Sequence, residues 1–455
     1  MLTLQGLLRK LTLDRLQLWG VWAMLFSISL FRLGRIGGSP NLALVKFCTL
    51  GTLLVWTANM LISRDGRSLL HWLRNESVLL YFLYFGVCFV SLINARYFDE
   101  VPNELLERFK AMLSFLLVVA LIRDRKSLRW AIFFFALGAI LPTLVGLYEL
   151  ASGKAFFKTS FRFGVVAQQQ AAGLRQTQYS GASRIQGLIC DAGLHGYTMV
   201  VYLGVVLPFF FYAKKLVLRL AAGALAFLFF VNLIGTGTRS AWLACAVMGM
   251  VFFVFLRHKH KTAMLTACIA GGVLIFLFLS LFPQIPTFER LHTKGNVSMV
   301  WRADTYYQAI RMACDHPFFG VGTGNYLNEY HNYLLDRPEL SRYYFGWLHN
   351  SYLQIWAENG TVGFAVFLAL WASIALGLLR TYFRMPDFEM KSFALGLLLA
   401  FTGHAVTFSS MPILYQELGG FIMGLAVATA AVAEREIAES LNDINGNHQA
   451  LAATK

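Results

Sequence analysis

Apolar stretches of membrane-spanning length follow one another from Leu16 to Ala433. Hydrophobic residues make up 57% of the chain and charged residues only 14%, which is too apolar for a domain coated by water. In lipid, a backbone must satisfy its own polar groups, so each stretch is expected to be a helix. The sequence therefore predicts an all-α, polytopic transmembrane bundle of about 12 helices.

The expected spans lie near 16–33, 41–62, 77–94, 105–122, 130–150, 194–213, 216–234, 241–256, 263–282, 361–379, 392–411 and 415–433. The fourth is the weakest, because Glu107, Arg108 and Lys110 lie in its first turns. The first is of spanning length and lacks a small-residue cleavage site, so we expect it to stay as a helix.

Basic residues gather in alternate connections between these spans. The connections hold Arg64, Arg67 and Arg74; Arg123, Arg125, Lys126 and Arg129; Lys214, Lys215 and Arg219; Arg257, Lys259 and Lys261; and Arg380, Arg384 and Lys391. The positive-inside rule makes them cytoplasmic, although Arg32 and Arg35 in the first outside loop go against the trend. Both termini are then cytoplasmic, with 434–455 as a tail that frays into a polar end.

The net charge of +15 does not indicate a nucleic-acid partner, because the basic residues sit in short runs that orient helices among membrane lipids. Within the transmembrane domain, 1–433, this topology leaves two long connections outside, 151–193 and 283–350. Loops of such length are usually functional or disordered. The second is rich in Tyr, Trp and Phe, so we expect a large structured loop, a helical cap between the ninth and tenth spans.

Cysteine and histidine spacing gives no sign of a metal site, so no metal and no cofactor are expected. Cys48, Cys88, Cys245 and Cys268 fall inside spans, where cysteine is a small apolar filler. Cys190 and Cys314 fall in the two outside loops. Spacing alone does not decide whether they form a disulfide.

Three arginines on the outside are candidates for binding an anion. Arg239 lies in a short turn between two apolar spans, after Gly235 and Gly237, whose small size would let a ligand approach the backbone. The alternative is a snorkelling anchor at the membrane border. Arginine offers a planar fork of donors that suits phosphate oxygens, so Arg239 and Arg184 form a candidate clamp for a diphosphate. Arg302 either joins them or serves the fold of its loop.

His349 begins the segment that leads into the tenth span. A lone histidine is more often a packed or capping residue than a catalyst, but a neutral imidazole here can take a proton from a sugar hydroxyl. Besides Arg302, we expect Asn350, Tyr352 and Trp301 to contact the substrate. Glu358 and Asn359 precede Gly360, which favours polar residues at a helix end with a glycine cap.

Other polar residues have simpler interpretations. The glycines at 320, 322 and 324 follow His316-Pro317 and predict a tight turn rather than a dinucleotide site, because no strand precedes them. His404, deep in the eleventh span, is expected to bond a neighbouring helix rather than to carry protons.

Several of these segments together resemble the O-antigen ligase and polymerase superfamily of bacterial envelope glycosyltransferases. The matching segments cover roughly 180–365: Thr238-Arg239-Ser240-Ala241-Trp242, residues 316–325, and His349-Asn350-Ser351-Tyr352-Leu353 with Glu358-Asn359-Gly360. Arg184 and Gly187 look like the family's Arg-x-x-Gly motif. The chain departs from the family at Asp191-Ala192-Gly193, where relatives often have an Asn-Pro-Asn-like turn.

The resemblance implies an enzyme of the bacterial inner membrane with a periplasmic active site. It implies a metal-independent, inverting transfer of a glycan from undecaprenyl diphosphate to an acceptor hydroxyl. Arginines like Arg184 and Arg239 would hold the diphosphate, and a histidine like His349 would activate the acceptor. The acceptor expected here is the lipid A-core sugar, which makes the chain an O-antigen ligase.

Other acceptors and one other class stay open at this point. A growing glycan chain would make the protein an O-antigen or exopolysaccharide polymerase, and a protein side chain an O-oligosaccharyltransferase. Arg162 to Gly173 and Arg311 to Gly322 match the polymerase Arg-x10-Gly spacing, but matches of this kind are expected by chance. A lipid-linked-sugar transporter would need polar groups along a transmembrane path, whereas the polar residues cluster on one side.

Overall fold

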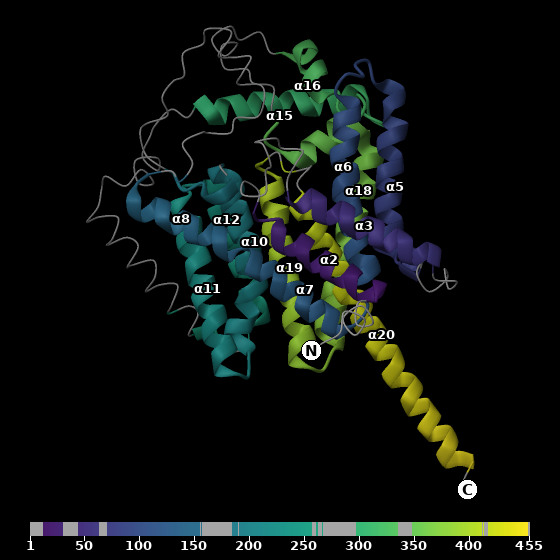
Figure 1. Cartoon of the computed structure of the whole chain (residues 1–455). Helices are drawn as coiled ribbons and strands as arrows, with labels where there is room; N and C mark the ends of the chain where they lie inside the picture. Colours follow the sequence, from purple (N-terminus) through teal and green to yellow (C-terminus); the bar gives the residue numbers. More distant parts are fainter. Residues whose placement is uncertain are drawn as a thin grey trace, which may run out of the picture.

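The computed structural model describes residues 12–30, 44–62, 71–154, 156, 184–189, 191–256, 261–262, 266, 297–334, 348–411, 413 and 417–453 (Figure 1). Every regular element within these ranges is a helix. The all-α prediction is therefore confirmed for the part of the chain that the structure describes.

The helices of the N-terminal half are α2 (Leu13–Ser27), α3 (Leu44–Ile62), η3 (His71–Arg74), α5 (Glu76–Val90), η4 (Ser91–Asn94), α6 (Val101–Leu121), α7 (Arg125–Gly138), α8 (Ile140–Ser152) and η5 (Gly187–Ile189). The remaining helices are α10 (Ala192–Tyr212), α11 (Leu216–Gly235), α12 (Arg239–Phe255), α15 (Val297–Asp315), α16 (Tyr326–Glu329), η6 (Tyr330–Tyr333), α18 (Ser351–Arg384), α19 (Phe388–Phe408) and α20 (Glu417–Ala453).

Each expected span that falls within the described residues is covered by helix, and the ninth, 263–282, lies almost entirely outside them. Eight helices of the described part are long and apolar enough to cross a membrane. The helix α12 is shorter, as is α2 with 15 residues, and α6 carries several charges. The count of about 12 spans thus stays a prediction.

Two boundaries differ from the sequence prediction. The expected fifth span, 130–150, is divided between α7 and α8, which meet at Ala139. The last span does not give way to a frayed tail at 434, because α20 continues as one helix to Ala453 and projects away from the bundle (Figure 1).

The helices α10 and α19 form the centre of the bundle, where most of their residues are buried. Glycines let the two backbones approach closely. A Cβ added at Gly204 would lie 2.6 Å from the backbone nitrogen of Ala400, and one added at Gly396 would lie 2.7 Å from the carbonyl oxygen of Val205. Small residues at helix crossings are the usual means of tight packing in membranes. His404 joins the same pair of helices, because its Nδ1 lies 2.8 Å from the Tyr197 hydroxyl, as predicted.

One end of the bundle, which we call the basic end, brings together connections predicted to be cytoplasmic. Arg125, at the start of α7, contacts Asp387 before α19 at 2.9 Å and also pairs with Glu436 of α20. Arg129 contacts Glu389 at 2.5 Å. Residues 123–129, 387–391 and 435–436 therefore lie at the same end, as alternate connections of an antiparallel bundle should.

The opposite end, which we call the site end, holds residues 184–189, 235–239 and 348–351. Figure 1 shows α15 lying across the bundle at this end, with α16 beside it. Residues of this cap form a small core of their own around Ala309, Met312, Tyr326 and Tyr330. The described part of the long second connection thus contains the helices α15, α16 and η6, and its periplasmic location stays a prediction.

Candidate active site

The corner at Arg184 is fixed by a buried carboxylate. Glu149, in the last turns of α8, accepts hydrogen bonds from the backbone amides of Gln186 and Gly187, each at 2.8 Å. The Arg184 guanidinium then donates to the carbonyl oxygen of Thr236 and to the hydroxyl of Thr238, both at 2.8 Å. Arg184 is thereby held against the turn that leads into α12.

Arg239 is the first residue of α12 and its side chain is exposed. Its backbone position is at a helix N-terminus, where free amides and the helix dipole favour an anion. The turn needs Gly237, whose φ is 59°. The Ile185 side chain fills the space beside Gly235, so a ligand does not have the expected access to the backbone at that glycine.

His349 lies beside α15. The Tyr306 hydroxyl donates to the His349 carbonyl oxygen at 2.9 Å, which ties the start of the tenth span to the cap. Burial, followed by the positive charge of Arg302, lowers the pKa of His349 to about 4. The imidazole is therefore neutral at physiological pH, the state in which it can accept a proton.

Arg302 shares α15 with Tyr306 and lies close enough to His349 to affect its charge. Within the part of the chain that the structure describes, its Nε is buried without a hydrogen-bond partner. A buried donor of this kind is costly unless something binds it. Trp301 precedes Arg302 in α15, and its side chain lies outside the described residues.

Asn350 and Tyr352 both serve the fold. The Asn350 side chain caps α18 by accepting from the backbone amides of Tyr352 at 3.0 Å and Leu353 at 3.1 Å. The Tyr352 hydroxyl donates to the carbonyl oxygen of Ala405 at 3.0 Å, and its ring packs against Phe408. Contact of either residue with a substrate stays a prediction.

The start of α10 connects the arginine corner to the histidine. The Thr238 hydroxyl donates to the Ala192 carbonyl oxygen at 3.1 Å. The next residue, Gly193, packs against the methyl group of Met411. The Ser351 hydroxyl donates to the Met411 carbonyl oxygen at 2.9 Å. Arg184 and His349 are thus linked through one continuous set of contacts at the site end.

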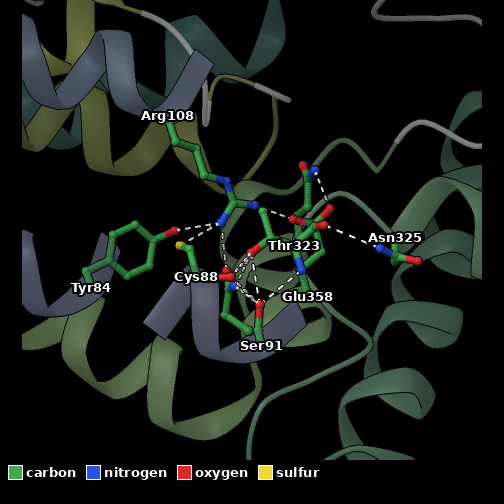
Figure 2. A network of polar contacts seen from close by, with 9 residues as sticks. Tyr84, Cys88, Ser91, Arg108, Thr323, Asn325 and Glu358 are labelled. Carbon is green, nitrogen blue, oxygen red and sulfur yellow. Dashed lines mark hydrogen bonds and ion pairs between the residues drawn. The ribbon is translucent and has the colours of Figure 1, made fainter. Parts of the chain in front are cut away.

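The sequence analysis missed a buried ion pair toward this end of the bundle (Figure 2). Arg108 of α6 pairs with Glu358 and also donates to the Asn359 side chain at 2.9 Å. Gly360, with φ of 65°, ends the helical segment as predicted, but Glu358 is more than a polar residue at a helix end. An arginine within a predicted span needs a buried partner, so the position of Arg108 in the fourth span could have indicated such an ion pair.

The tight turn predicted at residues 320–324 is confirmed, since all three of its glycines have positive φ. Cys314 of α15 is exposed, whereas Cys190 lies outside the described residues. The pairing of Cys190 with Cys314, which the sequence leaves open, thus falls outside the described residues.

Residues 224–368 match the family model described as O-antigen ligase. This range includes Arg239, Arg302 and His349 and ends within α18. A search of curated proteins found no match to the chain. The family match indicates a glycosyltransferase-like enzyme whose partners are lipid-linked glycans and lipid acceptors in general, and the apolar helices fit a multi-pass membrane protein. The similarity of residues 224–368 to the O-antigen ligase family thus supports the assignment of the chain to the O-antigen ligase and polymerase superfamily.

Proposed function

We propose that this protein is an O-antigen ligase-like glycosyltransferase of the bacterial inner membrane. It moves a glycan from undecaprenyl diphosphate to the lipid A-core acceptor at the periplasmic face. The observation that carries the proposal is a neutral imidazole, His349, beside the partly buried Arg302, both within the residues that match the O-antigen ligase family model.

The donor diphosphate is assigned to the arginines. Arg239 extends from a helix N-terminus. Arg184 is held on Thr236 and Thr238, which lie three residues and one residue before Arg239 in the chain. Guanidinium groups form paired, charge-assisted hydrogen bonds with phosphate oxygens. Fixed cations at this position would stabilise the negative charge that develops on the departing diphosphate.

The acceptor is activated by His349. The acceptor hydroxyl oxygen forms a bond to the anomeric carbon of the glycan, and the bond from that carbon to the diphosphate breaks. The hydroxyl proton passes to the neutral imidazole, and attack opposite the leaving group inverts the anomeric centre. The bound diphosphate would offset the charge of Arg302, which makes the imidazole a stronger base when donor is present.

The periplasmic orientation is supported by the separation of the two ends. The arginines of the basic end form ion pairs there, with Asp387, Glu389 and Glu436 as partners. Cytoplasmic connections of membrane proteins are enriched in such positive residues. The site end then faces outward, where lipid-linked glycans are used.

Purified protein in detergent tests the activity directly. With undecaprenyl-diphosphate-linked glycan, lipid A-core and no ion gradient, we expect glycan on lipid A-core and release of undecaprenyl diphosphate. Absence of product in this assay, with active glycan donor and folded protein, contradicts the proposal. If a glycan chain or a protein as acceptor also gave no product, the result would favour a lipid-linked-sugar transporter.

Gene deletion tests the acceptor. Loss of a ligase leaves polymer on undecaprenyl diphosphate and unmodified lipid A-core. Lipid A-core that bears a single repeat unit would instead identify a polymerase. Loss of glycan from proteins alone would identify a protein O-oligosaccharyltransferase.

A further inference from the structure

The helix α18 begins with a separate short helical segment that precedes the tenth span. Residues 351–359, which we call the leading half-helix, end at Gly360, whose φ of 65° and ψ of −170° break α18. His349 lies two residues before this half-helix. Its backbone is therefore attached directly to an element that is distinct from the rest of α18.

The start of the leading half-helix is held by hydrogen bonds. Asn350 caps it, and the Ser351 hydroxyl donates to the carbonyl oxygen of Met411 at 2.9 Å. The backbone amide of Ile413 donates to the same hydroxyl at 3.1 Å. These contacts fix one end of the half-helix to the connection between α19 and α20.

The other end is held by buried charge (Figure 2). Arg108 pairs with Glu358, and both side chains are almost completely buried. Gln354 donates to the second carboxylate oxygen of Glu358 at 3.1 Å. Asn359 accepts from Arg108 at 2.9 Å and donates to the Thr323 hydroxyl at 2.8 Å. The last turn of the half-helix is thereby attached to α6.

The loop after α15 completes this attachment. The backbone amides of Val321 and Gly322 donate to the carbonyl oxygens of Ala357 and Glu358 at 2.9 and 3.0 Å. Carbonyl groups at a helix end have no partner within their own helix, so the loop supplies one. The approach requires glycine at 320 and 360, where a Cβ would overlap the facing backbone.

We propose that Arg108 and Glu358 are positioning residues that hold His349 in place for acceptor activation. The inference rests on the proposed function, because it assigns His349 the role of base. A helix of nine residues transmits a displacement over about 13 Å, at 1.5 Å per residue. Reacting groups need placement within about 0.5 Å, so a small shift at the Glu358 end, carried along the half-helix, would misplace the imidazole.

The test removes both charges together, in Arg108→Gln with Glu358→Gln. A single change would leave an uncompensated buried charge and risks loss of folding, whereas two amides keep hydrogen-bonding capacity. We expect kcat to fall about 10- to 100-fold, with the KM for donor changed by less than about twofold. Diethyl pyrocarbonate acylates neutral imidazole. We expect it to modify His349 severalfold faster in the double variant than in the wild type, as measured by mass spectrometry of the peptide that contains His349.

The matched control is Arg129→Gln with Glu389→Gln, which removes an ion pair at the basic end. This variant should leave kcat and the modification rate of His349 as in the wild type. Arg108→Lys, which keeps the charge, should restore part of the kcat lost in the neutral pair.

Two outcomes overturn the positioning role. One is an unchanged modification rate of His349 in the folded neutral pair, and the other is an unchanged kcat. The failure of the proposed function would be recognised separately, because His349→Ala would then keep its transfer activity. The modification rate does not depend on that activity, so it reports on the half-helix in either case.

Discussion

Arg108 and Arg239 both belong to helices that begin near the site end, yet their surroundings are opposite. The Arg108 side chain is almost completely buried and donates to Glu358, Asn359 and Cys88. Arg239 is exposed at the start of α12, and no salt bridge to it forms within the described ranges. The first arginine has its counter-charge within the protein, whereas the second is open to an anion from outside.

The contrast separates structural charge from charge reserved for a ligand. A buried ion pair is strongly destabilising when broken, because the remaining partner loses both water and its counter-charge. An exposed arginine contributes little to folding. Substitution of Arg108 is therefore expected to lower stability, whereas substitution of Arg239 is expected to weaken donor binding.

The largest effect is expected at the proposed base. His349→Ala should lower the rate of glycan transfer ~100- to 10,000-fold, the usual contribution of a general base. The melting temperature should stay near that of the wild type, because the half-helix keeps its cap and its contacts. Near-normal transfer would leave His349 as a residue of the fold alone.

The next largest effect concerns stability. Glu358→Ala should lower the free energy of unfolding by about 3–5 kcal/mol, because Arg108 is left buried without its counter-charge. Glu389→Ala, which removes the partner of the half-exposed Arg129, should cost less than about 1 kcal/mol. Unfolding by SDS in mixed micelles measures both. Equal costs for the two variants would show that burial does not distinguish these pairs.

The smallest effect is a shift in pH dependence. Only the neutral imidazole accepts a proton, and the pKa of His349 is lowered to about 4 by burial and by Arg302. The acid limb of kcat/KM, which reports the free enzyme, should therefore lie well below the ordinary histidine value. Arg302→Gln removes one of the two causes that lower this pKa, so the acid limb should move to higher pH. An unmoved limb would mean that another group titrates.

The sequence was sufficient to predict the helices but not the side-chain contacts between them. Hydropathy predicted the helices, and charge distribution predicted which connections share an end, because both are local properties. The residues Arg184, Arg239 and His349 were found from polar residues at helix junctions. Their common location at the site end followed from the alternation of the spans.

Long-range partners escaped the sequence analysis for a physical reason. Arg108 and Glu358 are separated by 250 residues, so no local pattern relates them. Glu149 was overlooked at the end of an apolar stretch, although a carboxylate near a helix C-terminus is unfavourable and needs partners elsewhere. Its partners, the amides of Gln186 and Gly187, belong to a loop whose position depends on the tertiary fold.

The most direct test of the central claim is the affinity of Arg239→Lys for undecaprenyl diphosphate, measured by ligand-dependent thermal stabilisation. Lysine keeps the charge but loses the planar fork of donors. We expect the affinity to fall about tenfold or more, equivalent to one lost charge-assisted hydrogen bond. The control, Arg129→Lys at the basic end, should bind as the wild type does. Equal stabilisation of Arg239→Lys and wild type would contradict the account and leave Arg239 as an anchoring charge at the membrane border.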